Sequence, residues 1–342
     1  MTKYIFYLIT QLIILCLFLN CSGKDNVTVY VAGYEENKNA CVAKIWKNGK
    51  PENLSDGTKY AWADSIYVSG TDVYVAGNAS EGVAQLWING VGEKLTNGEN
   101  YAGAKSVFVS GSDILVAGFE NSSENNDRAK YWKNGKSITL SKGFEANSIA
   151  ALGKDVYVVG SGGSFLSSPP VRLSAKMWKN GKGIILSDNP RHFFEANDIH
   201  ISGKDIYVAG FEFIGSTFIA KVWKNGKGIN LTDERDSANA ESVFVSGNDV
   251  YVAGFVLADI IGGDKVATYW KNGTAVQLSD ETYESEAYSI FVFGDDVYVA
   301  GYENDGKKMR AVYWKNGKAV YLTNGKHRAK AKSIYVIDNS RG

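Results

Sequence analysis

The sequence predicts an all-β protein, a seven-bladed β-propeller built from four-stranded antiparallel blades. Three observations lead to this fold class. Seven tryptophans follow one another at separations of 41, 45, 46, 45, 47 and 44 residues, which is a repeat period. A copy of the phrase DVYVAG stands ahead of each of them, and most of them begin a WKNG or WING motif. The 342 residues include 37 glycines but only 4 prolines, a balance typical of short strands joined by tight turns.

Each repeat reads as four strands. The first resembles SIYVSG, the second is DVYVAG, the third has the pattern Ala-Lys-x-Trp, and the fourth is a short segment that ends in Leu-Ser or Leu-Thr. Residues 69–72 and their repeats predict a hairpin between the first two strands. Asn48-Gly49 and its repeats predict a type I′ hairpin between the last two. Antiparallel blades follow, and their radial stacking buries both faces of every sheet.

The two ends of the repeat array predict how the ring closes. The first repeat begins at its second strand, residues 27–33, whereas an extra first strand, residues 331–336, follows the last repeat. We expect the C-terminal strand to become the innermost strand of the N-terminal blade, which removes a free edge. The expected domains are a signal peptide at 1–20, a short tether at 21–26, the propeller at 27–337 and a C-terminal tail at 338–342.

The first 20 residues have the pattern of an export signal. An apolar run at 4–20 follows Lys3 and is shorter than the roughly 20 residues that a spanning helix needs. The run ends at Cys21 and resembles a bacterial lipoprotein signal, which implies cleavage before Cys21 and lipidation of its thiol. We therefore expect a lipoprotein of the outer membrane or cell surface. One alternative is that the segment stays uncleaved as an anchor. Another is ordinary secretion, which would make the protein periplasmic or secreted.

Over residues 27–337 the repeats resemble the extracytoplasmic seven-bladed β-propeller repeat proteins of bacteria, among which are propeller lipoproteins. The resemblance is one of architecture. The WKNG and DVYVAG phrases lack the signatures of WD repeats, Kelch repeats and the Asp-box of sialidases. No functional residue is carried over from any of these families.

Composition excludes several classes of protein. With 37 basic and 37 acidic residues the chain has no basic excess, so no nucleic-acid partner is expected. A hydrophobic content of 44% excludes disorder. Of the three cysteines, Cys41 alone remains in the folded part once Cys16 and Cys21 are assigned to the leader and the lipid, so no disulfide is expected. Three histidines without an HExxH or CxxC motif predict no metal site, and no cofactor is expected.

Residues that differ between repeats are the candidates for a binding site, because a residue shared by all blades serves the scaffold. The connections between strands two and three and between blades vary most and are expected on one face. Ligand-binding candidates on this face are an extra tryptophan, a nearby tyrosine and one mixed loop: Trp62, Tyr101, Arg191, His192, Phe193 and Phe194. The alternative is that Phe193 and Phe194 only fill the space between adjoining blades.

A second set of candidates comes from the residue before the Ser or Asp of each innermost strand. These seven equivalent positions have unlike polar side chains, which predicts an asymmetric pocket at the axis of the ring. The alternative is an ordinary solvated rim. The axial rim candidates are Asp64, Lys105, Asn147, Asn197, Glu241, Tyr288 and Lys332.

Together these patterns favour a non-catalytic scaffold at the bacterial cell envelope, a lipid-tethered monomer that engages an envelope protein or an extracellular glycan through its loop face. Whether the protein is an enzyme stays undecided from the sequence, which favours a protein without catalytic activity. The alternative function is a carbohydrate-active hydrolase or lyase with a carboxylate pair at the axial rim. The carboxylates considered for that pair are Glu145, Glu195, Glu241 and Glu286.

Overall fold

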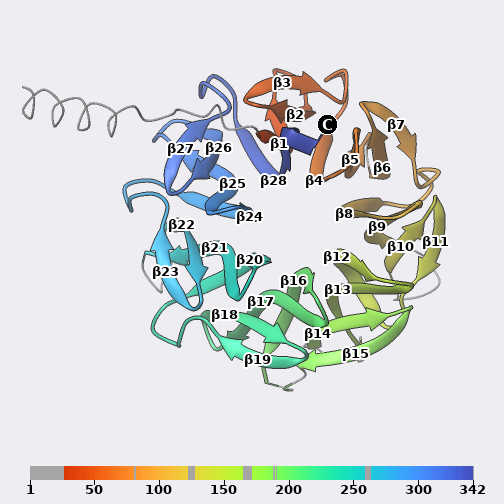
Figure 1. Ribbon diagram of the computed structural model, residues 1–342, viewed down its shortest axis with the longest axis vertical. Coiled ribbons are helices and arrows are strands. Elements are labelled where there is room, and N and C mark those ends of the chain that lie inside the picture. The colour runs from red at the N-terminus through yellow and green to blue at the C-terminus, as the bar shows by residue number, and fades with distance from the viewer. Residues whose placement is uncertain are drawn as a thin grey trace, which may run out of the picture.

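The computed structural model describes residues 27–80, 82–121, 128–164, 172–187, 189, 191–258 and 263–341. Within them the chain forms seven four-stranded antiparallel sheets arranged as a ring (Figure 1). The predicted signal peptide at 1–20 and the tether at 21–26 with Cys21 lie outside the described residues. No helix in the described part of the chain is long and apolar enough to cross a membrane.

Each blade runs outward from the axis, and all of its strands except the innermost strand of blade one follow chain order. Blade one contains β28 (Ala329–Asp338), β1 (Val27–Glu36), β2 (Cys41–Lys47) and β3 (Lys50–Asn53), and blade two contains β4 (Ala61–Ser69), β5 (Asp72–Ala79), β6 (Val83–Ile88) and β7 (Val91–Lys94). Blade three contains β8 (Ala102–Ser110), β9 (Asp113–Glu120), β10 (Ala129–Lys133) and β11 (Lys136–Thr139), and blade four contains β12 (Gly143–Leu152), β13 (Asp155–Ser164), β14 (Arg172–Lys179) and β15 (Lys182–Ser187). Blade five contains β16 (Phe193–Ser202), β17 (Asp205–Ile214), β18 (Thr217–Lys224) and β19 (Lys227–Asn230). Blade six contains β20 (Ala238–Ser246), β21 (Asp249–Leu257), β22 (Lys265–Lys271) and β23 (Thr274–Gln277), and blade seven contains β24 (Ser285–Phe293), β25 (Asp296–Asn304), β26 (Met309–Lys315) and β27 (Lys318–Tyr321).

The ring closes as predicted, because β28 pairs antiparallel with β1 and completes the first blade. Figure 1 shows the blue C-terminal strand beside the red N-terminal one. The strand continues to Asp338 and is followed by a turn of 3-10 helix at Asn339–Arg341, which lies within the predicted tail at 338–342. The Thr28 hydroxyl donates a hydrogen bond of 3.0 Å to the Asn339 side chain and fastens this end.

The repeated tryptophans form the core between blades. Trp46 is fully buried and packs against alanines of the seventh blade, including Ala300 and Ala311. The other repeated tryptophans are at most 3% exposed, and each belongs to an apolar cluster shared with a neighbouring blade. The small Ala of the DVYVAG phrase provides the space for the indole, because close packing needs a small residue opposite a large one. Cys41 is buried and free.

The Asn-Gly turns also bind the two hairpins of each blade together. Asn48 and Gly49 have φ values of 49° and 77°, as a type I′ turn requires. In the second blade Asn89 Oδ1 accepts a hydrogen bond of 2.9 Å from the backbone N–H of Val73, and its Nδ2 donates one of 2.8 Å to Asp72. The repeated Asp before the second strand is therefore a partner of the Asn-Gly turn as well as a turn residue.

Candidate functional site

Every innermost strand carries a β-bulge of one residue at the same position. In the second blade Ala63 pairs with Gly77 and Ser65 pairs with Ala76, which leaves Asp64 without a partner. A bulge of this kind bends the strand and re-aims the side chain of the extra residue. The register shifts in the other six blades fall at the equivalent place. The seven unpaired residues are the predicted axial rim, Asp64, Lys105, Asn147, Asn197, Glu241, Tyr288 and Lys332, and all seven line one pocket.

Beneath the rim lies a second ring formed by the next residue of each strand. Its members are Ser65, Ser106, Ser148, Asp198, Ser242, Ser289 and Ser333, and with the rim residues they enclose a smaller cavity of about 130 Å³. These side chains join neighbouring blades. Ser65 Oγ accepts a hydrogen bond of 3.1 Å from the N–H of Val107 in the third blade, and Ser333 Oγ accepts one of 3.2 Å from Ile66. The rim therefore stands on a hydrogen-bonded base.

A ring of mostly aromatic side chains lies below the serine ring, two residues further along each innermost strand. Tyr67 lies 5.0 Å from both Phe108 and Tyr335, measured between ring centroids, and the contacts continue through Phe291 and Phe244 to His200. Burial lowers the pKa of His200, so this ring member is held as the neutral imidazole. Ala150 occupies the position in the fourth blade.

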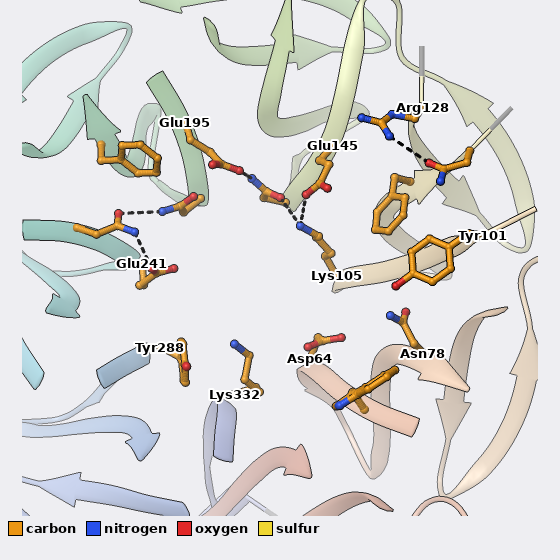
Figure 2. Close-up of a pocket in the computed structure, with 17 residues that line it drawn as sticks. Asp64, Asn78, Tyr101, Lys105, Arg128, Glu145, Glu195, Glu241, Tyr288 and Lys332 are labelled. Carbon is orange, nitrogen blue, oxygen red and sulfur yellow. Dashed lines mark hydrogen bonds and ion pairs between the residues drawn. The ribbon is translucent and has the colours of Figure 1, made fainter. Parts of the chain in front are cut away.

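Above the rim, two further sets of residues widen the pocket to about 780 Å³ (Figure 2). One set lies two residues before the rim on the inner strands, namely Trp62, Glu145, Glu195 and Asn239. The other set comes from the second strands and the loops that follow them: Asn78, Phe119, Asn121, Arg128 and Phe211. Trp62 pairs with Asn78, and Glu195 with Phe211, so the upper wall is built from strand neighbours.

One side of the pocket is a wall that contains two series of hydrogen bonds. The Lys105 ammonium forms an ion pair with Glu145 and donates a hydrogen bond of 3.0 Å to Asn147 Oδ1. Asn147 Nδ2 in turn donates to Glu195 Oε1 at 3.0 Å. Further round the ring, Asn197 donates to Asn239, and Asn239 Nδ2 donates to Glu241 Oε1 at 2.7 Å. Figure 2 shows these contacts passing from blade to blade.

Burial shapes the charge state of the carboxylates in this wall. It raises the pKa of Glu241 to about 7, and the negative charge of nearby Glu286 adds to the effect. Burial also raises the pKa of Glu195. The pKa of Asp64 is raised by burial as well, and Lys332 and Lys105 partly offset that rise.

Between the seventh and first blades the pocket meets a second cluster of ionisable groups. The Tyr288 hydroxyl donates a hydrogen bond of 2.8 Å to Glu286 and accepts one of 2.9 Å from the Lys330 ammonium. The Lys332 ammonium stands 3.4 Å from the centre of the Tyr288 ring, a cation–π contact. Burial lowers the pKa of Lys330 to about 8.

The ligand-binding candidates from the loop face separate into two groups. Trp62 and Tyr101 line the axial pocket. Trp62 stacks with Tyr60 at 5.9 Å and Tyr101 lies 5.8 Å from Phe119, so that side of the pocket is aromatic. Tyr101 is 54% exposed.

The segment from Arg191 to Phe194 does not reach the pocket. His192 Nδ1 lies 2.7 Å from a Glu212 oxygen, and Phe193 packs against Phe213 with 6.3 Å between ring centroids. Phe194 is 3% exposed and belongs to the core between blades, while Arg191 is exposed. The structure thus places Phe194 between blades, the alternative that the sequence left open.

Several pocket residues were not among the candidates from the sequence: Asn78, Phe119, Asn121, Arg128, Phe211 and Asn239. A signal for some of them exists. Residues two apart on a strand share a face, so Asn239 follows from Glu241 by alternation. Asn78, Phe119 and Phe211 stand opposite inner-strand residues and follow from the register, which needs the bulge to be recognised first.

Comparison with known proteins identifies the fold. No family model and no curated protein matches the chain. Among solved structures, the beta-propeller domain of the Trilobed protease from Pyrococcus furiosus is similar, with a TM-score of 0.56 and 13% identity over 88% of this chain and 93% of that one. The acylaminoacyl peptidase of Pyrococcus horikoshii is also similar, with a TM-score of 0.54 and 14% identity over 88% of this chain and 51% of that one. This chain therefore spans about half the length of that peptidase. The Pyrococcus furiosus domain has an open velcro topology, whereas β28 closes the ring here.

These comparisons correct the function expected from the sequence. A non-catalytic scaffold was expected, with a carbohydrate-active enzyme as the alternative, but the two similar propellers named above belong to peptidases. The expectation rested on the lack of catalytic motifs within the repeats. The missing motifs concern the residues of the blades alone. They do not bear on the catalytic domains to which a propeller can be joined. At this level of identity the likeness itself shows the shared fold.

Proposed function

We propose that the axial pocket binds a peptide segment and that the protein serves a peptidase-dependent step. The observation that carries this proposal is the composition of the pocket wall. Five asparagine side chains, Asn78, Asn121, Asn147, Asn197 and Asn239, line it together with the aromatic residues Trp62, Tyr101, Phe119 and Phe211. The likeness to the propellers of two peptidases supports the choice of a peptide over other ligands.

The chemistry of this wall suits a peptide backbone. A carboxamide presents both a donor and an acceptor, as does each peptide group. Asn147 and Asn197 donate both of their amide hydrogens within the protein and so offer a ligand their carbonyl oxygens, whereas Asn78 and Asn121 can exchange paired hydrogen bonds with a peptide group. The aromatic side offers an apolar surface for one or two side chains of the ligand. The cavity of about 780 Å³ is within the range of about 300 to 1,000 Å³ that is usual for small-ligand sites, which suits a few residues of peptide.

We further propose that the propeller is exported as a lipoprotein. The support lies in the leader, where the apolar run at 4–20 ends at Cys21. A lipid on Cys21 would hold the propeller at a membrane surface, where exported peptides are available to its pocket.

The experiment is a binding screen with the full chain purified in detergent. An equimolar pool of synthetic hexapeptides is dialysed against the protein, and the retained peptides are identified by mass spectrometry. We expect a retained subset, and Trp62→Ala should weaken its binding by about tenfold or more, because the substitution removes a stacking surface worth about 1.4 kcal/mol or more.

The matched control is Tyr283→Ala, since Tyr283 is 47% exposed and lies outside the axial pocket. This variant should retain the same peptides as the unchanged protein. Retention of no peptide, or equal retention by the Trp62→Ala variant, would overturn the proposal.

A further inference from the structure

The cations around the axial pocket already have partners in the structure. Lys105 is paired with Glu145. Lys265 lies 3.1 Å from Glu286, and the Lys332 ammonium rests on the face of Tyr288 at 3.4 Å. Lys105 and Lys265 are thus neutralised by carboxylates, whereas Lys332 lies against an aromatic ring and Arg128 contacts the ring of Phe144 and the neutral amide of Asn121.

Two other carboxylates of the wall differ from the carboxylates that hold Lys105 and Lys265. Glu195 accepts a hydrogen bond from Asn147 and Glu241 accepts one from Asn239, and each donor is a neutral amide. Among the described residues no lysine, arginine or histidine nitrogen lies within 4.0 Å of either carboxylate, in contrast to Glu145 and Glu286. Both residues are partly buried. A carboxylate that is partly shielded from water and has no cation is costly, and the cost is reduced when a positive charge arrives.

The two carboxylates occupy the same side of the pocket. Glu195 lies on β16 and Glu241 on β20, the inner strands of adjacent blades, and the charge of Glu195 adds to the negative potential at Glu241. Figure 2 shows both of them across the pocket from Tyr101. A ligand cation placed here would lie across the pocket from Tyr101.

We infer that the pocket takes the free amino end of its peptide, with the terminal ammonium group paired to Glu241 and held in the negative potential of Glu195. This inference rests on the proposed function and names its ligand more closely. An ammonium group has three N–H donors and forms charge-assisted hydrogen bonds, which are stronger in a shielded pocket than in water. The first side chains of the peptide then lie toward Trp62 and Tyr101.

The experiment compares two forms of one peptide. The probes are Ala-Ala-Phe-Ala-Ala with a free amino end and the same peptide N-acetylated, both amidated at the carboxyl end, and affinity is measured by calorimetry with the full chain. We expect the free amine to bind at least about tenfold tighter, the ratio that corresponds to about 1.4 kcal/mol. Equal affinities overturn the inference and leave peptide binding standing. Binding of neither form also overturns the inference, while the proposed function is decided by the hexapeptide screen.

Substitution of Glu241 gives a second readout. Glu241→Gln keeps the size of the side chain and removes its charge, so the free-amine peptide should fall to the affinity of the acetylated one. The control Glu234→Gln changes an exposed carboxylate outside the pocket and should retain the preference. A preference that survives Glu241→Gln overturns the inference. A melting curve verifies folding, and if the variant does not fold, the two peptides on the unchanged protein decide the matter alone.

Proton release provides a test without any substitution. Ammonium binding favours the ionised form of Glu241, whose pKa is about 7 in the free protein under the influence of Glu286, Glu195, Lys332 and Lys265. Near pH 6.5 the free-amine peptide should therefore release protons, seen as a dependence of the binding heat on the ionisation enthalpy of the buffer. A binding heat that is independent of the buffer contradicts an ammonium group at Glu241.

Discussion

A β-carbon on Gly77 would lie 2.0 Å from the backbone carbonyl oxygen of Trp62, closer than two unbonded atoms can approach. This contact joins the scaffold to the pocket. The inner strand turns its carbonyl toward Gly77 because of the bulge that aims Asp64 at the axis. The last glycine of the DVYVAG phrase has the same close approach in the other six blades. The repeated glycine thus allows the close strand approach at the bulge that directs each rim side chain toward the axis.

Gly77→Ala should be strongly destabilising for this reason. The backbone of the inner strand must shift to admit a methyl group, and we expect a loss of about 2 to 3 kcal/mol in the free energy of unfolding. Urea denaturation measures the change. Gly228→Ala is the control, because a β-carbon there meets its nearest neighbour, the indole nitrogen of Trp223, at 3.3 Å. A similar cost for both variants would show that the bulge does not require glycine.

The architecture was predictable because each blade repeats the same physical requirements. A tryptophan between blades, an Asn-Gly turn and an alternating second strand recur seven times, so chance agreement is excluded. The rim was predictable for the same reason, since equivalent positions in equivalent strands must lie on one circle. The repeat also located Tyr288 and Lys332, although no motif marks either residue.

The rest of the pocket was less predictable because it depends on the face to which a side chain points. Phe194 has the composition of a binding residue, yet the pleat of β16 turns it into the core. Phe119 and Phe211 each precede a Glu at the end of a second strand, where the sequence gives no sign of a pocket, yet their side chains line it. The bulge shifts the alternation by one residue, and sequence alone does not show where such a shift occurs.

Asp198 takes the place of the serine that the other six blades have beneath the rim. Its carboxylate accepts hydrogen bonds from the hydroxyls of Ser148 and Ser242 at 2.7 and 2.9 Å, and from the N–H groups of Ile199 and Val243 at 2.9 Å. Asp198→Asn should lower the free energy of unfolding by about 2 kcal/mol, because an amide NH₂ would face groups that are themselves donors.

Asp198→Ser restores the residue of the other blades and serves as the comparison. Its hydroxyl can accept a backbone N–H as Ser65 does, so we expect a smaller cost of about 1 kcal/mol or less. Chemical denaturation of both variants measures the order. If the serine variant is the less stable one, the carboxylate has a role that this hydrogen-bond pattern does not explain.

Deletion of residues 331–342 should open the ring. It removes most of β28, including Ile334 and Val336, which are 3% and 2% exposed in the core shared with Trp46. Loss of several buried side chains costs a few kcal/mol each, so we expect the melting temperature to fall by roughly 10 °C or more. Differential scanning calorimetry measures it.

A shorter deletion, of residues 339–342, distinguishes the effect of losing ring closure from the effect of shortening the C-terminus. It keeps β28 and removes the hydrogen bond between Thr28 and Asn339, so only a small change in melting temperature is expected. An unchanged melting temperature after the longer deletion would contradict ring closure as a source of stability.

Cys21→Ala tests the proposed lipid anchor. Without the thiol no lipid can be attached, and the protein should move from the membrane pellet to the soluble fraction after cell lysis. Cys41→Ala is the matched control, because Cys41 is buried in the first blade and should leave the distribution between fractions unchanged. Retention of the Cys21→Ala variant in the pellet would count against lipidation.

The pH dependence of stability should carry the signature of Glu241. Its pKa is raised from 4.5 to about 7 on folding, so between these pH values the folded protein binds more protons than the unfolded chain. The free energy of unfolding must then fall as pH rises through this window. Glu241→Gln removes the contribution, so urea denaturation from pH 4.5 to 7 should show a flatter decline than in the unchanged protein or in Glu234→Gln. Parallel profiles for all three proteins would mean that the Glu241 carboxyl is not held in its protonated form by burial. The pKa of Lys330 is lowered from 10.5 to about 8, so the folded protein binds fewer protons than the unfolded chain mainly between these pH values, above the window in which Glu241 acts.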